Sequence, residues 1–292
     1  MKYGLREICD VVLRAKAKMS VGNKTFYKDE PVIYFDSLKT STLEGAATTV
    51  YAQGGRGNSR LIAWEGERTV TFTMEDALIS TASLAILTGA DVVDATKDKP
   101  IIVHATEIVA LETATTAEGA IPATITLGEA ASGEADVYVM FLNDEGDPVT
   151  EPFIYKKGES GNAIVPVRST EKAGVAAKAV LVDYYVEKES GQQITITADK
   201  FGGNFYLEAS TLFRTEKGVD LPAEFIIPNC KVQSNFTFTM ASSGDPSTFT
   251  FTMDAFPDYT RFDPSKKVLS VIQVVTDDLD DGTEARTATP AV

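Results

Sequence analysis

The sequence predicts a mainly β protein: an antiparallel β-sandwich or barrel with one flanking α-helix. Segments in which apolar and polar residues alternate recur along the chain, and three are nearly identical, namely TVTFTM at 69–74 and FTFTM at 236–240 and 249–253. Such alternation places apolar side chains on one face of a strand and polar ones on the other. Turn-forming runs such as EGE, NDEGDP and ESGQQ separate the segments, and a helical period is clear in only one place.

The first hundred residues predict an antiparallel meander. Residues 3–19 fit either a helix or a buried strand. The polar stretch SLKTSTLEGAA, the glycine-rich GGRGNSR and the short EGE are expected as a connection, a loop and a tight turn. The strands expected around them are PVIYFD at 31–36, TTVYAQ at 48–53, RLIAW at 60–64 and RTVTFTM at 68–74.

One helix is predicted from about 75 to 88, in MEDALISTASLAILTGA. Its apolar residues recur at helical spacing, and Glu75 and Asp76 would lie in the first turn, near the positive end of the helix dipole. Gly89 follows the last periodic residue, as is common where helices end. We expect this helix to lie against the sheet.

The remaining chain predicts further strands within a single elaborated domain over 1–292. Its core is expected at about 1–102 and 173–276, with a β-rich insertion at about 103–172 and an acidic, flexible tail at 277–292. The two FTFTM copies are joined by ASSGDPS, so they predict a β-hairpin. The other expected strands are 101–112, 136–142, 163–168, 179–187, 193–200, 204–214, 224–232 and 266–275.

The three repeated segments share a face of threonines opposite a face of Phe, Val and Met. One interpretation is an ordinary two-faced strand, with a core on one side and solvent on the other. The other is that the threonine faces line a wall shared between subunits. The candidate wall residues are Thr69, Thr71, Thr73, Thr237, Thr239, Thr250 and Thr252.

Charge and composition exclude several classes of protein. The formal net charge is −15, from 42 acidic and 27 basic residues, which argues against tight nucleic-acid binding because that requires clustered Lys and Arg. An acidic surface fits either simple solubility or a surface past which DNA moves without adhering. No apolar run is long enough to span a membrane, and residues 1–19 lack the apolar core of a secretory signal. Cys9 and Cys230 are therefore expected as free thiols of a protein made in a reducing cytoplasm.

No catalytic residue, metal site or cofactor is predicted. The single histidine, His104, lies in the apolar run IIVHATEI and is expected as a surface or hydrogen-bonded strand residue. The loop GGRGNSR lacks the Lys of a phosphate-binding loop, and DDLDDGTE lacks the ligand spacing of an EF-hand. Arg56 and Arg60 in the glycine-rich loop fit either a flexible hairpin tip or a contact with acidic groups of a neighbouring subunit.

Two stretches of the sequence resemble tail tube proteins of long-tailed bacteriophages. The first begins YFDSLKTSTLEG and continues through VYAQGGRGNSRLIAWEGERTVTFTMEDALIS, and the second runs from ITADKFGGNFYLEASTLFR through EFIIPNCKVQSNFTFTM to STFTFTMDAF. They cover mainly residues 34–90 and 194–256. The resemblance implies a structural, non-enzymatic virion protein. It would form rings, as hexamers, that stack into a tube whose sheets enclose an acidic channel for DNA.

The resemblance also implies partners. These are further copies of the chain, the tape measure and terminator proteins, and a sheath if the tail contracts, with DNA as a transient cargo and no membrane. The protein would be synthesised in the host cytoplasm and reside in the phage tail. The alternatives are another virion component, such as a capsid decoration protein or a tail terminator, and a non-catalytic β-sandwich module that binds, for example, carbohydrate.

Overall fold

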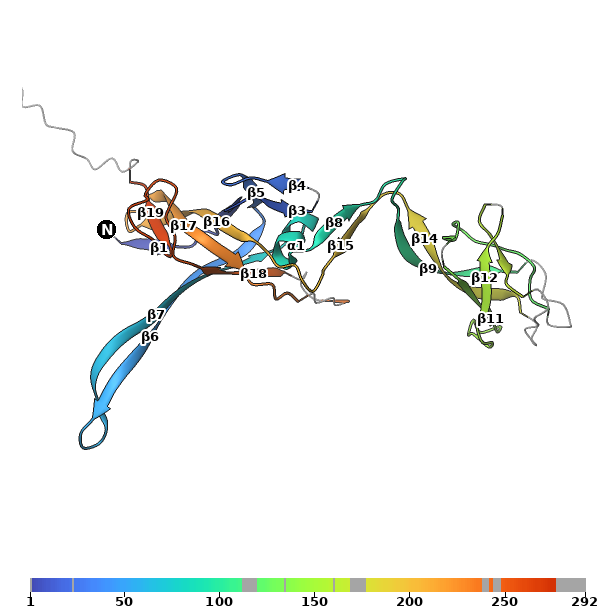
Figure 1. Ribbon diagram of the computed structural model, residues 1–292, viewed down its shortest axis with the longest axis horizontal. Helices are drawn as coiled ribbons and strands as arrows, with labels where there is room; N and C mark the ends of the chain where they lie inside the picture. Colours follow the sequence, from blue (N-terminus) through green and yellow to red (C-terminus); the bar gives the residue numbers. More distant parts are fainter. Residues whose placement is uncertain are drawn as a thin grey trace, which may run out of the picture. The chain divides into compact units, whose positions relative to one another are not determined.

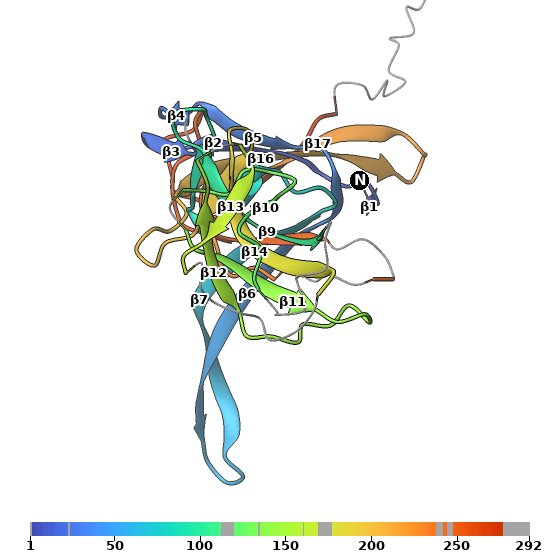
Figure 2. The ribbon, with the colours of Figure 1, turned by 90° about the vertical axis from the view of Figure 1, so that its right-hand side faces the viewer.

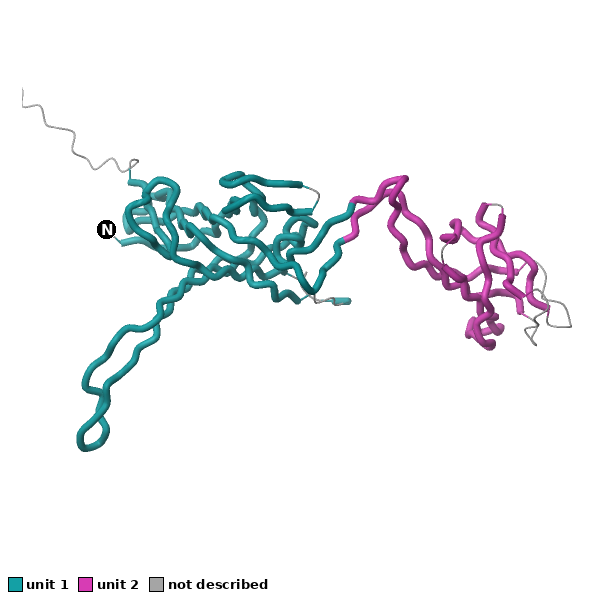
Figure 3. The backbone as a smooth tube through the Cα atoms, in the orientation of Figure 1, with its two compact units in different colours: residues 1–93, 194–292 teal, residues 94–193 magenta. Residues whose placement is uncertain are grey.

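The computed structural model describes residues 2–22, 24–111, 120–133, 135–159, 161–168, 177–237, 242–243 and 248–276. The chain divides into two compact units, the first formed by residues 1–93 with 194–292 and the second by residues 94–193 (Figure 3). The expected insertion, 103–172, lies wholly within the second unit. The mainly β, antiparallel fold is confirmed, and α1 (Thr81–Thr88) is the one α-helix in the described ranges (Figure 1).

The first unit is built on a nine-stranded antiparallel sheet that curls into half a barrel. Its order is β5-β2-β16-β17-β18-β7-β6, with β1 beside β16 and β19 beside β17. Residues 3–19 thus supply strands rather than a helix. The strands are β1 (Tyr3–Leu5), β2 (Asp10–Ala15), β5 (Pro31–Phe35), β6 (Leu38–Gly54), β7 (Ser59–Asp76), β16 (Asn204–Thr215), β17 (Asp220–Val232), β18 (Phe249–Ala255) and β19 (Val271–Val274).

Two short ribbons complete the unit. One pairs β3 (Met19–Val21) with β4 (Lys24–Phe26). The other pairs β8 (Asp91–Asp94) with β15 (Gln192–Thr195), and through it the chain leaves for the second unit and returns.

The core of the first unit lies under one face of the sheet, where α1 packs. The apolar members of the alternating strands meet there, and each fully buried side chain contributes about 1.5–3 kcal/mol relative to exposure. Ile86 and Leu87 of α1 join this cluster, as predicted for the helix. The largest strand residues in it are Leu13, Phe35, Phe72, Met74, Phe205, Leu207, Ile227, Phe251 and Met253.

The helix begins six residues later than predicted, at Thr81 instead of 75. Glu75 and Asp76 instead complete β7, opposite Thr250 and Phe249 of β18. The buried Asp76 carboxylate accepts hydrogen bonds from Ser37 Oγ (2.6 Å) and the Leu78 amide (3.2 Å). Ser80 is the N-cap residue of the helix, and its hydroxyl accepts a hydrogen bond from the Ser83 amide at 3.0 Å. The capping hydroxyl, and not the acidic pair, therefore stabilises the first turn.

The predicted tight turn at EGE is also wrong. β6 and β7 form one continuous long hairpin that runs through Gly66 and absorbs the polar SLKTSTLEGAA stretch. The register shifts between Ala47 and Thr49, and the Thr48 hydroxyl accepts a hydrogen bond from the Glu67 amide at 2.9 Å. A Cβ at Gly66 would lie 2.5 Å from that hydroxyl oxygen. The glycine therefore marks a bulge inside a strand and not the end of one.

The second unit has its own antiparallel sheet and its own core. The sheet order is β10-β13-β12-β11-β14-β9. Tyr155, Phe141, Ile164 and Val182 are among the fully buried side chains of its core. The strands are β9 (Ile101–Ala110), β10 (Ile125–Thr126), β11 (Val137–Leu142), β12 (Phe153–Lys157), β13 (Ala163–Pro166) and β14 (Ala179–Lys188).

The Gly89→Ala variant is expected to be destabilised by about 2 kcal/mol or more. Gly89 ends α1 in the left-handed region (φ 70°), and a Cβ there would lie 2.5 Å from the Phe201 carbonyl carbon. Gly45→Ala is the matched control, since a Cβ at Gly45 has no neighbour within 4 Å. Denaturant unfolding measures both, and equal stabilities of the two variants would contradict the close packing at Gly89.

Both cysteines are expected to resist thiol reagents in the folded protein. Cys9 and Cys230 are free and buried, which confirms the predicted thiols. Burial raises the pKa of Cys230 to about 12 and also raises the pKa of Cys9, so the reactive thiolate is scarce at pH 8. Ellman's reagent should therefore label both only after guanidinium is added. Fast labelling of either thiol without denaturant would argue against this burial.

Candidate functional site

The two similar segments TVTFTM and FTFTM lie side by side as neighbouring antiparallel strands, β7 and β18. Thr73 is directly opposite Thr252. On the other face, Phe72 is opposite Met253 and Met74 is opposite Phe251, and all four are buried in the core. The alternation thus makes one dry face and one threonine face across two strands, as the period of two requires.

The predicted hairpin between 236–240 and 249–253 is described only in part and stays a prediction. Phe236 and Thr237 belong to no strand but line one pocket with Thr248, Phe249 and Thr250, and β18 pairs with β17 and with β7. Most of the first FTFTM copy, with Thr239, lies outside the described residues. The pairing of β18 with the distant β7 places Phe251 and Met253 beside Phe72 and Met74 in one core.

The structure brings five of the seven candidate threonines onto β7 and β18. Thr71, Thr73 and Thr252 are half-buried, whereas Thr69 and Thr250 are exposed. Thr237 is exposed and belongs to no strand, but it lines the same pocket as Thr250 and Thr252. We call the surface formed by Thr71, Thr73, Thr250 and Thr252, with the residues paired to them, the threonine face.

Acidic side chains border the threonine face. Glu44 of β6 pairs with Thr71, which pairs in turn with Asp254 of β18. Glu75 pairs with Thr250, and Lys231 of β17 lies opposite Asp254. The Thr71 hydroxyl and the Gln233 side-chain amide both approach the Asp254 carboxylate, at 3.5 and 3.0 Å. The surface is therefore hydrated, with more carboxylates than cations along it.

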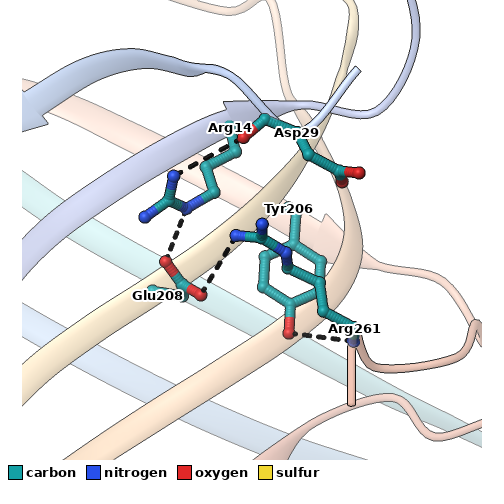
Figure 4. A network of polar contacts seen from close by, with 5 residues as sticks. All are labelled: Arg14, Asp29, Tyr206, Glu208 and Arg261. Carbon is teal, nitrogen blue, oxygen red and sulfur yellow. Dashed lines mark hydrogen bonds and ion pairs between the residues drawn. The ribbon is translucent and has the colours of Figure 1, made fainter. Parts of the chain in front are cut away.

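The other half of the same sheet face is covered by residues 256–268, which we call the C-terminal strap. Figure 4 shows the residues that anchor the strap. The Glu208 carboxylate of β16 accepts a hydrogen bond from Arg14 Nε at 2.7 Å, and its other oxygen lies 4.0 Å from Nη1 of Arg261 in the strap. The Arg261 amide donates to Tyr206 Oη (3.5 Å), and Lys16 pairs with Asp258 at 2.8 Å. Tyr206 is buried beneath the strap.

Electrostatics favour the docked strap. The hydrogen bond from Lys16 lowers the pKa of Asp258, so this carboxylate stays charged well below neutral pH. Burial, and secondarily the charge of Glu208, raises the pKa of Glu224 on the neighbouring β17. The strap therefore caps a charged, partly desolvated patch on β2, β16 and β17 and leaves the threonine face open. No sequence pattern connects these distant residues, and sequence analysis missed them.

The second surface feature is the outer part of the β6–β7 hairpin, residues 45–70, which we call the arm. Figures 1 and 2 both show it extending beyond the sheet of the first unit. Val50 and Trp64 form a cross-strand pair and are 61% and 53% exposed, and Leu61 and Ile62 are exposed as well. Apolar side chains on a two-stranded ribbon with no core of its own mark a contact surface.

The tip of the arm carries the two predicted arginines. The turn uses positive φ at Gly55 (78°) and Gly57 (90°), which glycine accommodates freely. Arg56 and Arg60 are both exposed, and the Arg60 guanidinium lies 4.1 Å from the centre of the Tyr51 ring. From 45 to 64 they are the only charged residues. Residues 45–64 of the arm therefore present apolar and cationic groups on a chain of net charge −15.

A curled sheet with an open polar face and a projecting apolar arm defines a structural β protein that acts through its surfaces. The chain belongs to the YomU/Tube protein family, whose model matches residues 19–267. This membership confirms the resemblance to phage tail tube proteins and makes the chain a structural component of the phage tail. Tube families of this kind are typically non-enzymatic. Comparison with curated proteins gives no match.

His104 lies in the second unit, exposed and hydrogen-bonded to Asp183 at 2.7 Å, which confirms its prediction as a hydrogen-bonded strand residue. The acidic run DDLDDGTE lies outside the described residues. Within the described ranges, no helix has the length and hydropathy to cross a bilayer.

Trp64 is expected to report the state of the arm. It is the only tryptophan, and 53% of its surface is exposed in a single copy of the chain. The dilute protein should therefore show the red-shifted emission of a hydrated indole and strong quenching by acrylamide. A blue-shifted emission that acrylamide hardly quenches, at concentrations where sedimentation shows a monomer, would contradict an arm open to solvent.

Proposed function

We propose that this protein assembles with copies of itself into closed rings, hexameric as the family resemblance implies, that stack into the tail tube. In this proposal the threonine face lines the channel through which DNA passes. The pairing of β7 with β18 carries the proposal, because it forms an open hydroxyl-rich surface bordered by Glu44, Glu75 and Asp254. A hydrated, acidic wall attracts no phosphate backbone, so DNA meets little friction there.

Ring closure requires a head-to-tail contact between different surfaces of neighbouring copies. The strands β5 and β6 end the main path of the sheet at opposite sides. Edge strands expose unpaired amide and carbonyl groups, and joining them between copies satisfies those groups. We propose that the neighbouring sheets join in this way around the channel.

The arm supplies the second contact in this proposal. Its apolar side chains gain burial only against another molecule, since the first unit offers them no core. Arg56 and Arg60 at its tip are complementary to the excess acid of a neighbouring copy. The two interpretations of these arginines are thus combined, as a hairpin tip that is also a contact.

The same proposal includes the roles of the two units, the other tail proteins that bind the tube, and the place of synthesis. The first unit is the tube-forming core, and the second unit, with the predicted insertion, decorates the outside of the tube. The tape measure and terminator proteins, and a sheath in a contractile tail, are the other tail partners. The protein is synthesised in the host cytoplasm before it enters the virion.

Substitution of Thr73, Thr250 and Thr252 by Lys tests the channel. Lysines on the wall would bind passing phosphates, so DNA delivery should fall by about tenfold or more while tubes of normal width still form. Substitution of the same positions by Ser keeps the hydroxyls and is the control. Electron microscopy measures the tubes, and transduction or DNA-ejection assays measure delivery. Normal delivery through Lys-bearing tubes would remove the channel from the proposal.

Substitution of Val50 and Ile62 by Asp tests the arm. Both side chains are more than half exposed (61% and 55%), so the thermal midpoint of the monomer should hardly change. Assembly should be lost, and with it the blue shift of Trp64 emission that accompanies burial of the arm in wild-type tubes. Val149→Asp, an exposed apolar position in the second unit (46%), is the control. Tubes formed by the double variant at wild-type concentration would exclude the arm as a contact.

A further inference from the structure

The sheet of the second unit exposes an apolar and aromatic surface on the side opposite its core. In an antiparallel sheet with one solvated face, that face is ordinarily polar. Here the alternate residues of β9, β11, β12, β13 and β14, on the side away from the buried Val139, Tyr155 and Val182, include large apolar side chains that are 38–65% exposed. They are Ile102, Ile108, Tyr138, Ile154, Val165 and Tyr185, with Val167 directly after β13.

Two tyrosines and a hydrogen-bonded pair lie close together on the part of this face formed by β11, β14 and the edge strand β9. Across β14, Tyr138 is directly opposite Asp183, and Tyr185 is directly opposite His104. His104 Nε2 lies 2.7 Å from Asp183 Oδ1, and the His104 and Tyr185 rings meet edge to face at 5.6 Å. Tyr138 and Tyr185 are thus diagonal neighbours, with Cβ atoms about 7 Å apart. Thr106, opposite Asp183, adds a hydroxyl to the same row.

This combination of groups suits a ligand that carries both C–H faces and hydroxyls. The side chains of His104 and Asp183 remain 54% and 42% exposed, so they can exchange their hydrogen bonds to water for bonds to a ligand. A dry protein interface over these residues would have to desolvate this polar pair, which costs free energy unless the partner replaces its hydrogen bonds. Acidic residues outnumber basic ones over 94–193, which disfavours an anionic ligand.

We propose that this face, which we call the tyrosine face, binds a neutral carbohydrate. The rings of Tyr138 and Tyr185 stack on the C–H faces of sugar rings, and His104, Asp183 and Thr106 bond their hydroxyl groups. Because these side chains lie on the exposed face of a sheet, each copy binds weakly, and repeated copies raise the avidity. The binding function is separate from tube formation, since all of these residues belong to the second unit.

The test uses the full-length protein and immobilised neutral oligosaccharides of glucose, galactose, mannose and N-acetylglucosamine, beside sialylated and sulfated ones. We expect at least one neutral glycan to bind and the anionic ones to bind more weakly. Titration of the best binder should give an affinity that falls about tenfold or more in Tyr138→Ala and in Tyr185→Ala, as loss of a stacked ring predicts. Tyr185→Phe keeps the ring and should retain most of the affinity.

Tyr259→Ala is the matched control, because Tyr259 and Tyr138 are each 42% exposed but Tyr259 lies on the strap of the first unit. Thermal unfolding checks that each variant folds, and electron microscopy checks that each still forms tubes. Absence of binding to every neutral glycan at millimolar concentration would overturn the proposal. So would wild-type affinity in both alanine variants, a preference for anionic glycans, or a protein ligand that competes for this face in place of sugar.

Discussion

The pairing of β7 with β18 is the contact on which the first unit depends. Phe72, Met74, Phe251 and Met253 interlock on its inner face, and the threonines follow on the outer face because the backbone alternates. A change that shifted the register by one residue would send the four apolar side chains to solvent and the threonines into the core. The same strand register therefore determines both the apolar core and the threonine face, so neither can change without the other.

The strap gives this sheet face two different halves. On β2 and β16, the contacts of Arg14, Glu208 and Arg261 hold the strap in place, whereas the threonines of β7 and β18 remain half-buried or exposed. A charged network at the centre of the sheet is a modest source of stability, because the pairing of its charges only offsets their desolvation. Its geometric effect is larger, since it fixes the line at which the covered half ends and the open half begins.

Local patterns predicted the faces of the strands well but predicted their partners poorly. The period of two in FTFTM predicted the correct inward residues, whereas the local pattern did not predict that β7 is a neighbour of β18, because sheet pairing is decided by a core assembled from distant segments. The EGE run failed as a turn because Gly66 serves a bulge against Thr48. The tyrosine face was hidden for another reason: IIVHATEIVA is apolar on both sides of the strand, so alternation alone could not say which side is buried. The Arg14–Glu208–Arg261 contact could not be predicted, because its three residues lie far apart in the sequence and no local pattern connects them.

The two ends of the second unit leave the first through the same ribbon. The Ala95 amide donates to the Gly191 carbonyl at 2.8 Å, and the Gln192 side chain bonds Asp94 at 2.7 Å. Because the two ends of the second unit lie close together, the first unit needs only a β-hairpin at which the unit is inserted. A short turn could connect the two strands of that hairpin equally well. The second unit is thus exchangeable in principle: a different fold with equally close ends could take its place while the strand pairing of the first unit stays unchanged.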